Sequence, residues 1–153
     1  MTPKELRILT EIRSMGLFHD LDPAHLHKLV SIATEVDFSP GEIICEEGEV
    51  GQAIYLIQEG EVTIEMVLSD RMVTLFTVGA GHLFGWSSLF VERRKQARSR
   101  VTEPTRAIVI DAAQLRDLFR SDHQLERVIM HRMTQVIAER VYSARLQLAK
   151  ALS

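Results

Sequence analysis

A glycine-rich turn that leads into a short helix is the segment of this sequence best suited to bind an anion. Residues 78–90 read VGAGHLFGWSSLF. Glycines let the backbone approach a ligand closely, and the first N–H groups of a helix have no intrahelical partner, so such a turn can hold a phosphate. The densest positive charge of the chain follows at residues 93–100, which read RRKQARSR. Anion-binding backbone next to cations predicts a phosphate-bearing ligand.

The composition is that of a soluble globular domain. The chain has 153 residues, of which 46% are hydrophobic and 25% charged, and its formal net charge is -3. This length supports one core, and the charge is not that of a general nucleic-acid binder. The single cysteine, Cys45, excludes a disulfide framework and a cysteine-ligated iron–sulfur cluster. Because no apolar run approaches the roughly 20 residues that cross a bilayer, we expect a cytoplasmic protein without a membrane partner.

Two helices are expected before the β-rich part of the chain. Thr2-Pro3 and Asp22-Pro23 each pair a helix-capping residue with a proline suited to the first helical position. We therefore expect helices over residues 2–15 and 22–33. Their apolar residues recur at helical spacing, as Leu6, Leu9, Ile12 and Met15 in the first and Leu26, Leu29, Val30 and Ala33 in the second.

Short strands separated by Gly, Pro and acidic turns fill the middle of the chain. Alternating or short apolar runs indicate strands at residues 43–45, 53–57, 62–68, 72–78, 101–102 and 106–110. Many short strands with such turns are typical of an antiparallel sandwich or barrel.

The C-terminal part reads as two helices. Asp111 and Gln114 fit a capping box, and Asp122 caps a last helix from His123 to about Leu152. A helix of about 30 residues is about 45 Å long, more than a small domain covers. We expect its first half to pack on the β domain and its second half on a partner helix, most simply in a homodimer. The apolar positions are Leu125, Val128, Ile129, Met133, Val136, Ile137, Val141, Ala144, Leu148 and Leu152.

Taken in order, these segments resemble the cyclic nucleotide-binding domain of catabolite activator-type regulators, protein kinase regulatory subunits and gated channels. The resemblance rests on Leu17-Phe18 with Leu21, on residues 38–44 and 47–62, and on residues 78–85, which resemble the lead into the family's phosphate-binding cassette. It implies a mainly β fold with flanking helices, an eight-stranded antiparallel jelly-roll (double-stranded β-helix) barrel, and a long C-terminal helix. It also implies a cyclic nucleotide-binding-like domain at residues 1–122 and a dimerisation and signalling helix at residues 123–153.

The resemblance further implies which residues bind the ligand, and two of them depart from the family. The family has a glutamate after its Phe-Gly pair, which accepts from the ribose 2′-hydroxyl, whereas Trp86 can only donate. The family has an arginine on the cyclic phosphate, whereas this chain has Lys95, or Arg94 or Arg98 if the alignment shifts. The expected ligand-binding residues are Phe84, Gly85, Trp86, Ser87, Ser88, Leu89, Lys95, Gln96, Ala97 and Arg98.

Two functions remain open at this point. In the first, the domain binds cyclic AMP, cyclic GMP or a related phosphate ligand, and ligand capture moves the C-terminal helix. In the second, Trp86 fills a degenerate pocket, and the domain acts as a dimerisation or protein-interaction module. A fragment of a DNA-binding regulator is a third, less favoured interpretation. No helix-turn-helix follows the long helix here, so we expect no direct DNA binding from this chain.

No pattern of residues indicates catalysis or metal binding. A metal-binding barrel enzyme of the cupin type needs a His-x-His pair on strands, but His25 and His27 fall on an expected helix and point to different sides. His82 reads as a solvated loop residue, and Glu46 and Glu47 should raise the pKa of the Cys45 thiol. We expect no enzyme, no metal and no cofactor other than the nucleotide ligand.

Overall fold

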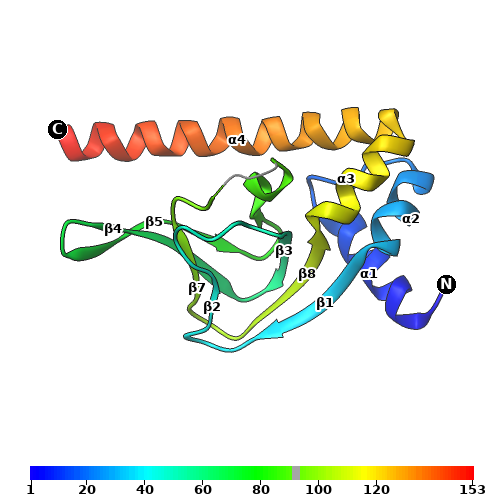
Figure 1. The fold of residues 1–153 in the computed structure, drawn as a ribbon, viewed down its shortest axis with the longest axis horizontal. Helices are drawn as coiled ribbons and strands as arrows, with labels where there is room; N and C mark the ends of the chain where they lie inside the picture. The colour runs from blue at the N-terminus through cyan, green and yellow to red at the C-terminus, as the bar shows by residue number, and fades with distance from the viewer. Residues whose placement is uncertain (91–93) are drawn as a thin grey trace. The chain divides into compact units, whose positions relative to one another are not determined.

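The computed structural model describes residues 1–90 and 94–153. The chain divides into two compact units, Met1–Asp117 and Leu118–Ser153, which are described separately. The elements, labelled in Figure 1, are α1 Pro3–Ser14, α2 Pro23–Ser31, β1 Ala33–Phe38, β2 Ile43–Cys45, β3 Ala53–Glu59, β4 Glu61–Leu68, β5 Arg71–Gly79, β6 Leu83–Phe84, the 3-10 helix η1 Trp86–Leu89, β7 Arg98–Val101, β8 Thr105–Asp111, α3 Ala112–Ser121 and α4 His123–Leu152.

The strands form two four-stranded antiparallel sheets. One has the order β1-β8-β3-β6 and the other β2-β7-β4-β5, which is the strand order of a jelly roll. The pairings join distant parts of the chain, since β1 pairs with β8 in the register Val36↔Ala107. A mainly β fold with flanking helices is therefore confirmed. Closure of the two sheets into a barrel stays a prediction.

Side chains from both sheets form one core beneath the glycine-rich turn. Tyr55 of β3 stacks on Phe84 of β6 with ring centroids 4.8 Å apart, and Phe38 of β1 meets Tyr55 edge-on at 6.2 Å. The two-residue strand β6 is therefore held by packing as well as by its pairing with β3. The buried core cluster is Ile57, Val62, Val78, Phe84 and Val101.

The N-terminal helices form where their caps predict. The side chains of Thr2 and Asp22 accept hydrogen bonds from the backbone N–H groups of Glu5 and Ala24. Each cap satisfies a first-turn N–H that would otherwise lack a partner. Their apolar faces are buried in the same unit as the sheets, at Ile8, Leu9, Ile12, Leu26, Leu29 and Val30.

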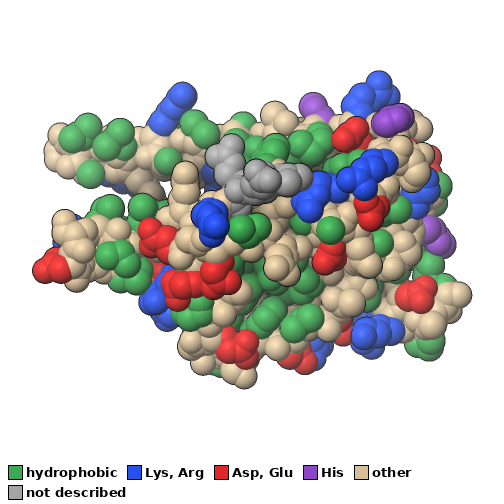
Figure 2. Space-filling view, viewed as in Figure 1, with side chains coloured by type: hydrophobic (Ala, Val, Ile, Leu, Met, Phe, Trp, Pro, Cys, Tyr) green, Lys and Arg blue, Asp and Glu red, His purple; other side chains and the backbone are tan. Residues whose placement is uncertain are grey.

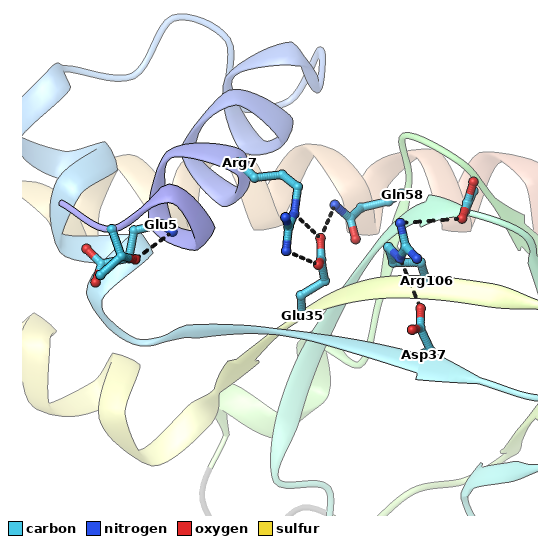
Figure 3. Close-up of polar contacts among 8 residues, drawn as sticks. Glu5, Arg7, Glu35, Asp37, Gln58 and Arg106 are labelled. Atoms are coloured by element: carbon cyan, nitrogen blue, oxygen red, sulfur yellow. Dashed lines mark hydrogen bonds and ion pairs between the residues drawn. The ribbon is translucent and has the colours of Figure 1, made fainter.

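An ion pair ties α1 to the first sheet, as Figure 3 shows. Arg7 donates to the Glu35 carboxylate at 2.9 Å, and Gln58 Nε2 donates to the same group at 3.0 Å. The hydrogen bond from Arg7 holds the pKa of Glu35 below its ordinary value, although burial opposes this effect. Arg106 pairs with Asp37 on the same sheet at 3.0 Å.

The sequence-based expectation did not include strand β1, and it placed the start of β7 too late. Ala33 is not the last residue of the second helix but the first of β1, where it pairs with Ile110. Strand β7 begins at Arg98 rather than at Val101, because Arg98 pairs with Glu65 of β4. In both places pairing with a distant strand overrides the local pattern.

The second unit consists of the end of α3 and of α4, whose bounds His123–Leu152 confirm the long helix. The Asp122 side chain caps it by accepting from the backbone N–H of Leu125 at 2.9 Å. Burial changes along α4: Leu125, Ile129 and Met133 are buried, Val136 and Ile137 are half-buried, and the apolar residues from Val141 onward are exposed. The exposed apolar residues of α4 are Val141, Tyr142, Leu146, Leu148 and Leu152.

Among the described residues no helix is long and apolar enough to cross a membrane.

Candidate functional site

Gly85 turns the chain out of β6 and into η1. Its φ of 87° and ψ of 11° lie in the left-handed region, which glycine adopts without steric cost. A Cβ at this position would come within 2.7 Å of the carbonyl oxygen of Ala53. Residue 85 therefore cannot carry a side chain without moving the backbone, and the turn places η1 directly beside the start of β3.

Helix η1 presents two serines of different environment. Ser88 donates its N–H to the Gly85 carbonyl at 3.0 Å, closing the single turn. The Ser88 side chain is buried, with the residue 2% exposed, and its hydroxyl has no hydrogen-bond partner among the described residues. Leaving a buried hydroxyl unpaired costs about 1–3 kcal/mol, so this position is suited to a ligand oxygen. Trp86 is half-buried and meets Phe90 edge-on at 6.5 Å.

Lys95 reaches η1 from the segment before β7. Its ammonium donates to the Ser87 hydroxyl at 2.6 Å. Its backbone N–H donates to Glu49 O and its carbonyl accepts from Gly48, both at 2.8 Å, so the base of the side chain is fixed. No carboxylate within ion-pair distance of Lys95 is found in residues 1–90 and 94–153. Burial lowers the pKa of this ammonium, and the neighbouring Cys45 opposes the shift.

Gly51 provides the space in which these groups meet. A Cβ at Gly51 would overlap Lys95 Cε and Ser88 Oγ and would lie 2.8 Å from Lys95 Nζ. The absence of a side chain at this position therefore leaves room beside Gly51 for both the end of Lys95 and the unpaired Ser88 hydroxyl. We call Gly51, Gly85, Ser87, Ser88 and Lys95 the cradle.

The other expected cations are engaged elsewhere. Arg94 donates to the Gly48 carbonyl at 2.9 Å. Arg98 and Arg100 both donate to Glu65, at 2.7 and 2.9 Å. Glu65 is 2% exposed, and the hydrogen bond from Arg100 is the main cause that lowers its pKa. The charges of Arg98 and Arg100 are thus neutralised, and among the described residues of the basic segment Lys95 is the cation that bonds a cradle serine.

The remaining residues that were expected to bind the ligand differ in burial. Phe84 and Leu89 are buried, and Phe84 belongs to the core. Gln96 is exposed and Ala97 is half-buried in the segment that joins Lys95 to β7. Arg93, the first residue of the basic segment, lies outside the described residues.

Three contributors to this region carry no local signal in the sequence. Gly51 is one of several turn glycines, and only the fold shows what it faces. Arg116 of α3 donates to the Ser88 carbonyl at 2.8 Å, across 28 residues of sequence. The pKa of the Cys45 thiol is raised mainly by burial and next by Glu49, which the sequence did not indicate, while the expected contribution of Glu46 is present but smaller.

The histidines and acids do not assemble a metal site. Within the described part of the chain, no three His, Cys, Asp or Glu side chains are grouped to hold a metal ion. His25 is buried on α2, and His82 is exposed in the glycine-rich turn.

Known proteins are similar in sequence to parts of this chain. A cyclic nucleotide-gated cation channel of Drosophila melanogaster is 32% identical over 97 residues, which are 63% of this chain and 14% of the channel sequence. A cyclic AMP receptor protein of Thermus thermophilus is 30% identical over 142 residues, 90% of this chain and 62% of the receptor. The chain therefore spans less than two thirds of the length of either relative.

A solved structure of a cyclic nucleotide-binding domain from Methylobacillus flagellatus KT has the same fold. Its TM-score is 0.83 at 22% identity, and the match covers 96% of this chain and 83% of that one. The family described as the cyclic nucleotide-binding domain matches residues 35–122, which run from β1 through the cradle to the end of α3. Since this match takes in more than half of the 153 residues, the chain belongs to the cyclic nucleotide-binding domain family.

Proposed function

We propose that the chain is a regulatory domain that binds cyclic AMP, cyclic GMP or a related phosphate ligand in the cradle and signals through α4. Two neighbouring groups support the proposal. Among the described residues, the half-buried Lys95 ammonium has no carboxylate partner, and the buried Ser88 hydroxyl has no hydrogen-bond partner. Each group lacks what a phosphate oxygen supplies.

The cradle offers a phosphate a complete set of donors. Lys95 supplies a charge, and Ser87 and Ser88 supply hydroxyl donors. The first N–H groups of η1, beginning at Trp86, add backbone donors of the kind found at helix N-termini. Charge-assisted hydrogen bonds of this type are about twice as strong as neutral ones, so the phosphate would provide most of the affinity.

Trp86 makes this site chemically different from one in which a carboxylate binds the sugar. Its half-buried ring can lie against the sugar or base of the ligand, and its N–H can donate but not accept. We therefore expect binding to depend on the phosphate more than on the ribose hydroxyl.

The output of such a domain would be carried by α4. Its second half exposes apolar residues, and Figure 2 shows hydrophobic side chains on this part of the helix. We propose that this segment pairs with its copy in a homodimer, which would cover Val141, Tyr142, Leu148 and Leu152. The proposal places the protein in the cytoplasm, where its small ligand is available.

Titration calorimetry with cyclic AMP and with cyclic GMP, up to millimolar ligand, tests the binding. We expect heat and a rise in melting temperature with at least one of the two nucleotides. The matched control is Ser87→Ala with Ser88→Ala, which removes both hydroxyl donors and should weaken binding about ten-fold or more. No heat and no thermal shift with either nucleotide would contradict the proposal.

A second candidate is a pocket that binds no nucleotide in a domain that serves dimerisation or protein interaction. One contact favours it: the Lys95 ammonium is already bonded to the Ser87 hydroxyl, so a ligand must share or replace that bond. If the calorimetry shows no binding while sedimentation shows a dimer, this second function is the correct one. If the chain is part of a longer regulator, DNA binding would lie in the part beyond this sequence.

A further inference from the structure

Helix α3 is attached to both sides of the cradle. Its first residue, Ala112, donates its backbone N–H to the carbonyl of Gln52 at 2.9 Å, and Gln52 directly follows Gly51. Four residues later, Arg116 Nη1 donates to the carbonyl of Ser88 at 2.8 Å. One hydrogen bond therefore reaches the Gly51 side and the other reaches η1.

The two attachment points lie on one face of a helix that is itself well anchored. Residues four apart in an α-helix share a face, so Ala112 and Arg116 are neighbours along α3. Ala112 and Leu115 are buried, and the Asp111 carboxylate caps the helix by accepting from the Gln114 N–H at 2.9 Å. The first turn of α3 is thus fixed, and Arg116 reaches η1 from a rigid base.

Ser88 is the residue through which Arg116 contacts the cradle. Its hydroxyl is the orphaned group near Gly51, its N–H closes η1, and its carbonyl is held by Arg116. A ligand oxygen that engages this hydroxyl must act on the same residue that α3 holds. Any change in the distance between Ser88 and Gly51 must also change the hydrogen bonds that Arg116 and Ala112 make to Ser88 and Gln52.

We infer that Arg116 is a positioning residue that couples occupancy of the cradle to the position of α3. This inference rests on the proposed function. Arg116 fixes η1 in the ligand-free protein. A ligand that binds the Ser88 hydroxyl and shifts Ser88 also shifts the carbonyl to which Arg116 donates, and so acts on α3. Because α4 follows α3 after Asp122, the movement is passed along the chain.

Hydrogen exchange without ligand tests the hold of Arg116 on η1. In Arg116→Ala we expect the Ser88 and Phe90 amides, which close η1, to exchange about ten-fold faster, since a hydrogen bond from a charged donor is lost. Arg116→Lys, which keeps a charged donor, should recover part of the protection. Arg120→Ala removes a charge from an exposed residue one turn further along the same helix and should leave both amides unchanged. Equal exchange in Arg116→Ala and the wild type would overturn the inference.

The second arm uses cyclic AMP as the probe at a saturating concentration for each variant. In the wild type and in Arg120→Ala we expect the ligand to alter exchange in residues 112–121. In Arg116→Ala the ligand still binds, about three- to ten-fold more weakly by the loss of one hydrogen bond, but the response in residues 112–121 is lost. A full response in bound Arg116→Ala would overturn the coupling.

The two arms separate the two claims. If wild-type protein binds no cyclic AMP, the proposed function fails, and the ligand-free arm still decides whether Arg116 positions η1. If Arg116→Ala does not fold, Arg116→Met keeps most of the apolar length of the side chain but has no N–H donor, so it serves in both arms and is judged by the same outcomes.

Discussion

The Lys95 ammonium donates a 2.6 Å hydrogen bond to the Ser87 hydroxyl. Ser87 belongs to η1, whereas Lys95 lies in the segment before β7. This bond keeps a partly desolvated charge beside η1. On the alignment that places Lys95 at the arginine of the family's cassette, a point charge oriented by Ser87 would take the place of the guanidinium fork.

Replacing Lys95 tests whether this charge binds the ligand. We expect Lys95→Met to weaken cyclic nucleotide binding about ten- to hundred-fold, since a charge-assisted hydrogen bond is lost. Lys95→Arg should bind as well as the wild type or better if the guanidinium reaches the phosphate. Arg94→Met is the control, because Arg94 bonds the Gly48 carbonyl. Undiminished binding by Lys95→Met, measured by calorimetry, would remove Lys95 from the site.

The lowered pKa of Lys95 gives binding a pH dependence of defined sign. A phosphate requires the charged ammonium, so affinity should fall as pH rises through the Lys95 pKa, below the ordinary value of about 10.4. The ligand-free protein should gain stability over the same window, because the unfolded chain binds more protons there. Both trends should be absent in Lys95→Met. Calorimetry and urea unfolding between neutral pH and about pH 10 measure them.

A methyl group at Gly51 should block the cradle without unfolding the protein. The added Cβ overlaps Lys95 Cε and Ser88 Oγ, and the flexible lysine end can move aside. We expect Gly51→Ala to lose at least about ten-fold in affinity and about 1–3 kcal/mol of unfolding free energy, since the buried Ser88 side chain must also shift. Gly16→Ala is the matched control, since nothing lies within 4 Å of a Cβ there. Wild-type affinity in Gly51→Ala would place the ligand elsewhere.

Trp86 should determine how much the ribose contributes. In the wild type we expect cyclic AMP and its 2′-deoxy analogue to bind within about three-fold of each other, because Trp86 offers no acceptor. Trp86→Glu should favour the ribose form by about ten-fold or more, as expected for a hydrogen bond to a carboxylate. Trp86→Gln separates charge from acceptor capacity. A strong ribose preference in the wild type would show that another residue reads the 2′-hydroxyl.

The ion pair between Arg7 and Glu35 should stabilise the first unit in a pH-dependent way. Because the Glu35 pKa is lowered, its contribution is present above the ordinary glutamate pKa and is lost as pH falls through the folded value. We expect Arg7→Met to lower the unfolding free energy at neutral pH by about 1 kcal/mol or less, since Arg7 is half exposed. The difference should vanish in acid. Arg13→Met, measured alongside by urea unfolding, should show no such dependence.

The exposed end of α4 should control association. Leu148 is 60% exposed, and a charge at this position would oppose a helix-to-helix contact. We expect wild-type protein to sediment as a dimer at micromolar concentration and Leu148→Glu as a monomer. Ser143→Glu adds the same charge at an exposed polar position of the helix and should leave the dimer intact. A monomeric wild type at high micromolar concentration would rule out the homodimer.

Local signals were sufficient for much of this molecule. The caps at Thr2, Asp22 and Asp122 each act within one helical turn, so their residue types alone predicted where helices begin. The turn at Gly85 could likewise be predicted from the sequence, because a left-handed backbone conformation before a short helix favours glycine. The family resemblance was read from such segments in order, and the match to residues 35–122 agrees with it.

The composition of the cradle depends on contacts that no local pattern encodes. Lys95 bonds Ser87 because residues 48 and 49 hold its backbone, and Gly51 matters because Ser88 lies opposite it. Arg98 looked like a ligand residue in the chain, but its pairing with Glu65 across two strands engages its charge. Sequence spacing fixes neighbours within a turn or a strand. Which distant side chains meet, and which charges are neutralised, follows from strand register and burial in the folded protein.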